Sequence, residues 1–101
     1  MASIAKLVDS AIKDNAVVVF SKSYCPYCVK AKDLLTMRKV SFVAFELDKR
    51  QDGPQIQDYL QHKTGQRTVP NIFINQIHVG GSSDLDVAAS SGELNKLLKE
   101  Q

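Results

Sequence analysis

The most constraining feature of this chain is a short apolar run, Ala16-Val17-Val18-Val19-Phe20. Its length and its β-branched composition favour a strand over a helix. Because no polar residue alternates within the run, both faces of the strand are expected to be buried, as is typical of parallel sheets covered by helices. The run therefore predicts an α/β fold that contains a parallel pair of strands.

Helical and strand patterns alternate along the rest of the chain. In chain order we predict a helix over residues 3–14, a strand over 16–20, a helix from 25 or 26 to about 38, a strand over 41–47, a helix from its N-cap at Asp52 to Gly65, strands over 71–74 and 77–79, and helices starting at Ser83-Asp84 and at a Ser90 capping box. The first two strands form the parallel pair, and the last two form a hairpin around Asn75-Gln76. The result is a mixed four-stranded sheet flanked by about five helices.

Length and composition indicate one domain, residues 1–101. With 44% hydrophobic and 24% charged residues, the chain can form a core without a disulfide framework or a structural metal. The net charge is only +2 and the positive residues are scattered, which argues against nucleic-acid binding.

Two further sequence features bear on location. The longest apolar run is far shorter than the roughly 20 residues that span a membrane. The first 15 residues place charged side chains within a helical pattern, unlike a secretory signal. We therefore expect a cytoplasmic protein that does not associate with membranes.

The two cysteines stand in Cys25-Pro26-Tyr27-Cys28, where the first strand passes through a loop into a helix. A thiol in the first helical turn faces unpaired N–H groups and the positive end of the helix dipole, which favour the thiolate. We therefore expect Cys25 to be acidic and nucleophilic. Pro26 suits the first turn, because its missing N–H would have no partner there. Cys28 lies on the same side one turn later, less exposed but close enough to attack a disulfide on Cys25.

Two other interpretations of the cysteines are weaker. A zinc site would need Cys25, Cys28, His62 and His78, but the histidines are too far apart in sequence for known fingers. A structural disulfide across so short a loop would add little stability. A CxxC near a βαβ pattern is instead typical of a thioredoxin-like redox site. We interpret the two histidines as structural or solvated.

Three segments together resemble the dithiol glutaredoxins of the CPYC type: residues 25–28, Thr68-Val69-Pro70, and Gly80-Gly81-Ser82-Ser83-Asp84. They occur in the order and at the separations of that family, and the likeness spans essentially the whole chain. A thioredoxin would carry Trp beside its first cysteine, and this chain has no Trp. The resemblance implies a thioredoxin-like fold and a glutathione-dependent thiol–disulfide oxidoreductase. Glutathione would be the electron-donating cosubstrate, with no bound cofactor and no metal.

The resemblance also implies the residues that bind glutathione. They are Lys22, Tyr27, Gln66, Thr68, Val69, Pro70, Gly81, Ser83 and Asp84. Lys22 and Gln66 match positions near the glycyl carboxylate, and Val69, before a cis proline, pairs with the cysteinyl backbone. Ser83 and Asp84 match the positions that receive the γ-glutamyl group.

Simpler roles for these residues stay open. Lys22 is also explained as a solvated surface lysine, Gln66 as a loop residue and Pro70 as a trans proline before a strand. Ser83 or Asp84 is also explained as an ordinary helix cap. Arg67 either steers an anionic ligand or faces water.

In the implied reaction, Cys25 attacks a protein–glutathione mixed disulfide, and Cys28 resolves mixed disulfides formed with protein disulfides. The expected partners are glutathione and glutathionylated or disulfide-bonded proteins, and the chain is expected to be a monomer. Two other functions stay open. An iron–sulfur carrier would bridge a cluster between two subunits, a mode that Pro26 disfavours. A non-enzymatic interaction module would have no need of Cys25, Lys22 and Asp84.

Overall fold

The computed structural model describes residues 3–99. Its elements are α1 (Ile4–Asp14), β1 (Val17–Ser21), α2 (Pro26–Met37), β2 (Val43–Glu46), the 3-10 helix η1 (Leu47–Lys49), α3 (Gly53–Thr64), β3 (Asn71–Ile74), β4 (Ile77–Gly80), α4 (Ser82–Ser91) and α5 (Glu93–Lys99). The predicted order of α-helices and strands is confirmed, and η1 is an addition to it. None of the helices in this range has the length and apolar character needed to cross a membrane.

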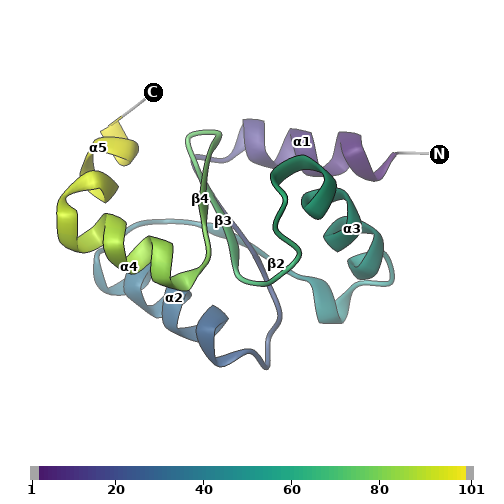
Figure 1. Ribbon diagram of the computed structural model, residues 1–101, viewed down its shortest axis with the longest axis horizontal. Coiled ribbons are helices and arrows are strands. Elements are labelled where there is room, and N and C mark those ends of the chain that lie inside the picture. The colour runs from purple at the N-terminus through teal and green to yellow at the C-terminus, as the bar shows by residue number, and fades with distance from the viewer. Residues whose placement is uncertain (1–2, 100–101) are drawn as a thin grey trace.

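The four strands form one mixed sheet in the order β2-β1-β3-β4 (Figure 1). Strand β1 pairs in parallel with β2 and antiparallel with β3, and β4 pairs antiparallel with β3. All five residues of β1 are buried, as predicted for a strand covered on both faces. The mixed sheet and its parallel pair are therefore confirmed.

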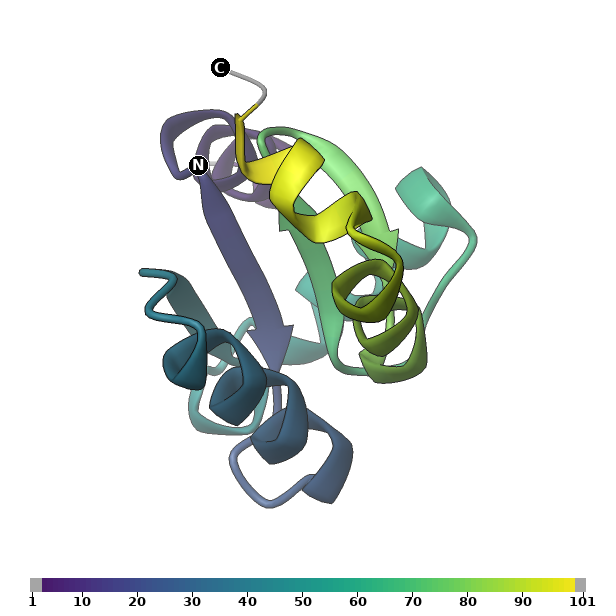
Figure 2. The same cartoon turned by 90° about the vertical axis from the view of Figure 1, so that its left-hand side faces the viewer.

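Alternate residues of β1 face two separate apolar cores, because successive side chains of a strand point to opposite faces. One core holds Val17, Val19, Ala31, Leu35, Ile72, Ile74, Leu85, Ala88, Leu94 and Leu97. The other holds Val8, Ala11, Ile12, Val18, Phe20, Leu47, Ile56, Leu60 and Phe73. Helices α2, α4 and α5 cover the first face and α1 and α3 the second (Figure 1), and Figure 2 looks onto the first of these layers.

Local sequence signals explain several element boundaries. The Ser3 hydroxyl caps α1 by accepting a hydrogen bond of 3.0 Å from the Lys6 N–H. Gly65 ends α3 in the left-handed conformation that lacks a steric penalty for glycine. Asn75 and Gln76 both have positive φ, as a two-residue hairpin requires. The predicted hairpin is therefore confirmed.

Asp52 stands at the N-cap of α3, as predicted, but its carboxylate pairs with Arg50 at 2.8 Å and does not cap the helix with its side chain. Two boundary predictions were wrong. The second strand is shorter than predicted, because residues 47–49 turn into η1. Helix α4 starts at Ser82 and runs through the predicted capping residue Ser90, because the left-handed turn that separates it from α5 lies at Gly92.

Candidate active site

Four loops meet at the edge of the sheet where β1 ends. The parallel partner β2 ends there too, since Ser21 lies opposite Glu46. The antiparallel strand β3 begins there, and β4 ends there, because Phe20 lies opposite Asn71 and Ile72 opposite Gly80. The sheet thus brings the loop with Cys25 next to residues 68–70 and to the start of α4.

Cys25 is the N-cap of α2, directly before Pro26 in the first turn. Its carbonyl accepts a hydrogen bond of 3.0 Å from the Val29 N–H, and its own N–H donates to the Lys22 carbonyl at 3.1 Å. The Cys25 Sγ lies 3.9 Å from the Val69 carbonyl oxygen. The helix start therefore fixes a partly exposed thiol against the loop before β3.

The environment of Cys25 favours its thiolate, as predicted. Partial burial acts to raise the pKa of this thiol, but other groups outweigh it. Backbone N–H groups of Cys28 and Tyr27, the Cys28 thiol and the charge of Lys22 all stabilise the anion, so the pKa of Cys25 is lowered. A thiolate at this position is the form that attacks disulfides.

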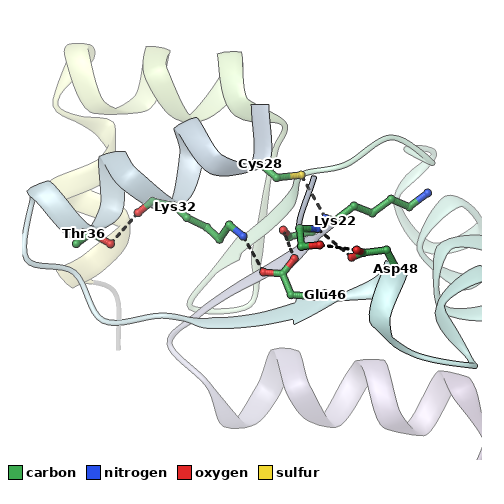
Figure 3. Close-up of polar contacts among 8 residues, drawn as sticks. Lys22, Cys28, Lys32, Thr36, Glu46 and Asp48 are labelled. Atoms are coloured by element: carbon green, nitrogen blue, oxygen red, sulfur yellow. Dashed lines mark hydrogen bonds and ion pairs between the residues drawn. The ribbon is translucent and has the colours of Figure 1, made fainter. Parts of the chain in front are cut away.

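Cys28 has the opposite character. Its side chain is fully buried, and burial raises the pKa of its thiol. The Lys22 N–H donates to Cys28 Sγ at 3.4 Å, which ties the sulfur to the loop before α2 (Figure 3). Both cysteines are free thiols. The pair thus consists of an accessible acidic thiol and a buried, less acidic one.

A groove of about 570 Å³ opens beside Cys25, between the loop before β3 and the start of α4. It is lined by Tyr27, Gln66, Thr68, Val69, Pro70, Gly81, Ser82, Ser83 and Asp84, and we call it the Val69 groove. Every residue that the sequence predicted for the ligand site lines it, except Lys22. The structure therefore brings these residues together beside Cys25.

One wall of the Val69 groove is the loop over residues 66–70. The Val69–Pro70 peptide bond is cis, as the resemblance implied. The Gln66 amide donates hydrogen bonds to the carbonyls of Thr68 at 3.1 Å and Pro70 at 3.0 Å. Gln66 therefore braces this loop, and its amide must exchange a bond before it can donate to a ligand.

The opposite wall is the first turn of α4. Gly80 has a φ of 117°, which glycine adopts without penalty, and it turns the chain into the helix. Asp84 Oδ2 accepts a hydrogen bond of 2.9 Å from the Gly81 N–H. Asp84 therefore caps this helix while it lines the groove.

The sequence prediction did not include Ser82 among the site residues. Its side chain is buried in the groove wall, and its hydroxyl has no hydrogen-bond partner within residues 3–99. The one sequence feature that could have predicted Ser82 as a site residue is its position directly after Gly80-Gly81, between the predicted site residues Gly81 and Ser83.

Lys22 and Arg67 act differently from the groove residues. The Lys22 side chain extends away from Cys28 (Figure 3), and its charge acts on the Cys25 thiol from outside the groove. Arg67 pairs with Asp58, so it faces α3.

The histidines do not join the cysteines. His78 bonds to Asn71 at 2.9 Å, and burial lowers the pKa of its ring, while the charge of Asp84 acts in the opposite direction. His62 is exposed. Within residues 3–99, no three histidine, cysteine or acidic side chains gather as metal ligands would.

A polar network near Cys28 was also missing from the sequence prediction (Figure 3). Ser21 and Lys32 both contact the carboxylate of Glu46, and we call these three residues the Glu46 network. Asp48 nearby accepts hydrogen bonds from the Ser23 N–H and hydroxyl. The sequence feature that could have predicted this network is the pair of acids on either side of Leu47, Glu46 and Asp48. They stand where the strand that pairs in parallel with the first strand was predicted to end.

Comparisons with known proteins agree with this geometry. The sequence model of the family described as Glutaredoxin matches residues 17–79. Glutaredoxin-2 of Schizosaccharomyces pombe is 50% identical over 101 residues, covering 99% of this chain and 92% of the relative. Wheat glutaredoxin is 49% identical, with a TM-score of 0.88 over 96% of this chain and 89% of the other.

A buckwheat glutaredoxin solved as a complex with glutathione is 38% identical, with a TM-score of 0.93 over 96% of this chain and 88% of the other. The likeness thus extends through sequence and fold. On these matches, the chain belongs to the glutaredoxin family of thiol–disulfide oxidoreductases.

Proposed function

We propose that this protein uses glutathione to reduce protein–glutathione mixed disulfides through Cys25 alone, and protein disulfides through Cys25 and Cys28 together. The observation that carries the proposal is the acidic Cys25 thiol beside the Val69 groove, with a buried second thiol one turn away. The glutathione bound to the similar buckwheat protein supports the choice of cosubstrate.

The single-thiol route needs only Cys25. Its thiolate attacks the glutathione sulfur of the mixed disulfide, a new S–S bond forms, and the reduced protein leaves as a thiolate that takes a proton from water. A second glutathione thiolate then attacks the sulfur of the bound glutathione. This step releases oxidised glutathione and restores the Cys25 thiolate.

The two-thiol route adds Cys28. Cys25 attacks a protein disulfide and becomes joined to one protein sulfur, and Cys28 then attacks Cys25 Sγ and releases the reduced protein. The Cys25–Cys28 disulfide is reduced by two glutathione molecules. Because Cys28 is fully buried, only a disulfide already held on Cys25 is within its reach.

Glutathione has a carboxylate at each end, and the Val69 groove has matching groups at two separated places. At one end, Gln66 of the groove, together with Lys22 outside it, would receive the glycyl carboxylate. At the other, the N–H groups of Ser83 and Asp84 would receive the γ-glutamyl carboxylate, and the Asp84 carboxylate would pair with its ammonium. Between them, the Val69 backbone would pair with the cysteinyl unit, and Tyr27, Thr68, Pro70 and Gly81 would line the groove.

The test is turnover of a glutathionylated peptide and of a protein disulfide by the wild type, Cys25→Ser and Cys28→Ser. We expect Cys25→Ser to lose both activities. Cys28→Ser should keep the first and lose much of the second, because its Cys25 still stands at the helix start. Equal losses in the two variants would contradict the division between the thiols.

We further propose that the protein works as a monomer in the cytoplasm. Of the large apolar side chains exposed on its surface, three lie on α2, and the others are spread over the loop before α2 and over β2, β4 and α4. Light scattering should therefore give the mass of one chain. A stable dimer with stoichiometric iron and sulfide would favour the iron–sulfur carrier instead.

A further inference from the structure

Cys25 stands at the end of a short turn on the surface. Residues 22–25 form this turn, which is closed by the Cys25 N–H donating to the Lys22 carbonyl at 3.1 Å. In the middle of the turn, the Tyr24 side chain is 70% exposed, so apolar packing does little to hold it. A segment with few buried apolar contacts is mobile unless polar contacts fix it. The polar contacts of this turn therefore decide where Cys25 and Lys22 lie.

A carboxylate from another element holds the turn. Asp48 Oδ1 accepts a hydrogen bond of 2.9 Å from the Ser23 N–H, and Asp48 Oδ2 accepts one from the Ser23 hydroxyl (Figure 3). Because the carboxylate is ionised at neutral pH, both hydrogen bonds are charge-assisted and stronger than neutral ones. One acid thus binds both the backbone and the side chain of a residue in the middle of the turn.

The backbone that carries Asp48 is itself fixed by the core. Asp48 lies in η1 directly after Leu47, which is buried in the core on the face covered by α1 and α3. The start of α3 packs so closely there that a Cβ at Gly53 would collide with the Leu47 carbonyl. The contact with Ser23 therefore ties the exposed turn to a rigid part of the fold.

The neighbouring acid acts on a different part of the chain. Glu46 accepts a hydrogen bond of 2.7 Å from the Ser21 hydroxyl and pairs with Lys32 Nζ at 2.7 Å. Ser21 is the last residue of β1, so the Glu46 network fixes the chain where the turn begins. Asp48 fixes the middle of the turn, two residues before Cys25.

We propose that Asp48 is a positioning residue for Cys25, because it holds the turn before α2 through Ser23. The turn sets both the direction of the Cys25 side chain at the helix start and the point from which Lys22 extends. The positive charge of Lys22 stabilises the Cys25 thiolate, so a turn held in one conformation keeps that charge close to the thiol. The inference deepens the proposed function, and it rests on that function only in taking Cys25 as the attacking thiol.

The charge of Asp48 and its hydrogen bonds predict opposite effects on the pKa of Cys25. A negative charge makes a nearby thiolate harder to form, so by electrostatics alone the removal of Asp48 would lower this pKa. If Asp48 positions the turn, its removal raises this pKa, because Lys22 and the thiolate are no longer held together. The sign of the change therefore separates the two explanations.

Two substitutions distinguish the hydrogen bonds from the charge. Asp48→Ala removes the charge and both acceptors. Asp48→Asn removes the charge but keeps an amide oxygen that can accept a hydrogen bond from the Ser23 N–H. Positioning therefore predicts that alanine raises the pKa of Cys25 and that asparagine does not.

The experiment is alkylation by iodoacetamide as a function of pH, followed by the mass of the intact protein. The thiolate is the reactive form, so the pH midpoint of the rate reports the pKa of the thiol. Cys28 is fully buried, so the first addition reports Cys25. The assay needs no glutathione.

We expect Asp48→Ala to raise the midpoint by roughly half a pH unit, which slows alkylation about threefold at pH values below both midpoints. Asp48→Asn should have its midpoint at or below that of the wild type. Above the midpoints, where Cys25 is ionised in every protein, the rates should agree. A general loss of structure would change the rate at every pH, and urea unfolding shows independently that each variant is folded.

Asp52→Ala is the matched control. Asp52 lies four residues after Asp48 and is also engaged, since it pairs with Arg50 at 2.8 Å, but its partner is outside the turn. We expect this substitution to leave the midpoint of Cys25 unchanged. An upward shift as large as that of Asp48→Ala would overturn the role of Asp48.

Ser23→Ala tests the same contact from the other side. It removes the hydroxyl and keeps the N–H, so we expect a smaller upward shift than in Asp48→Ala. The double variant should have the midpoint of Asp48→Ala alone, because the Ser23 hydroxyl has already lost its acceptor there. A further rise in the double variant would show that the two residues act separately and would overturn the inference.

Two other results would also overturn it. One is a midpoint in Asp48→Ala that is equal to or below that of the wild type. The other is a rise in Asp48→Asn as large as in Asp48→Ala. Turnover of a glutathionylated peptide by the wild type tests the proposed function separately. If the peptide were not turned over but the midpoints shifted as expected, the proposed function would fail and the positioning role of Asp48 would stand.

Discussion

Replacing Asp84 by alanine and by asparagine separates helix capping from ligand recognition at the start of α4. Asp84 Oδ2 accepts the hydrogen bond from the Gly81 N–H, while Oδ1 has no hydrogen-bond partner within the part of the chain that the structure describes. Alanine removes both the acceptor and the charge. Asparagine keeps an oxygen that can accept from Gly81 and removes only the charge.

The two roles have different expected sizes. Loss of a helix cap lowers the free energy of unfolding by about 1 kcal/mol, which lowers the Tm of a domain of this size by roughly 4–8 °C. An exposed charge-assisted contact with the glutathione ammonium contributes about 1 kcal/mol, or roughly fivefold in kcat/KM. We therefore expect Asp84→Ala to lose stability and activity, and Asp84→Asn to lose activity alone.

Urea unfolding measures the first quantity, and turnover of a glutathionylated peptide measures the second. Reduction of a disulfide that lacks glutathione, by Cys25 in the same variants, is the control and should change little. If Asp84→Asn kept the wild-type kcat/KM for the glutathionylated peptide, Asp84 would be a helix cap and nothing more. Equal slowing of both substrates would also refute the assignment of the γ-glutamyl end.

Alkylation of Cys25 by iodoacetamide should have its pH midpoint below the value of about 8.5 for a free cysteine. A midpoint at or above 8.5 would contradict the lowered pKa. In urea unfolding, Gly80→Ala should lower the free energy of unfolding by about 1–3 kcal/mol, because φ is 117° and the new Cβ would collide with the Asp84 carboxylate. Gly92→Ala should lower it by only about 1 kcal/mol, because Gly92 has φ 87° but open space around it. Equal losses in the two variants would show that the collision has no effect. The Ser23 hydroxyl and N–H lower the pKa of Asp48 below 3.8, so the ionised Asp48 side chain stabilises the fold at neutral pH and this stabilisation is lost as the pH falls below that value. The difference in unfolding free energy between the wild type and Asp48→Asn should therefore shrink on acidification. A difference that stays constant with pH would contradict the lowered pKa.

The sequence was sufficient for the features that depend on local periodicity and on the chemistry of helix ends. The buried strand at residues 17–20, the helix that starts at Cys25-Pro26 and the hairpin at Asn75-Gln76 follow from patterns a few residues long. The unequal acidity of the two thiols follows in the same way, since a helix start favours the anion at one position and burial opposes it at the other. The groove residues depended on the resemblance to a family, because nothing local marks Thr68 or Gly81 as neighbours of Cys25.

Only the tertiary structure decided which distant groups meet. The contact between Cys25 Sγ and the Val69 carbonyl joins residues 44 positions apart, and it exists because β3 starts at the edge where β1 ends. The contact between Ser21 and Glu46 joins residues 25 positions apart, through the parallel register of β1 and β2. The local sequence around a polar residue near a strand end does not indicate whether its side chain contacts solvent or a buried group. Strand order and register determine which groups such a side chain contacts. Both are set by the packing of the whole sheet against its two helical layers.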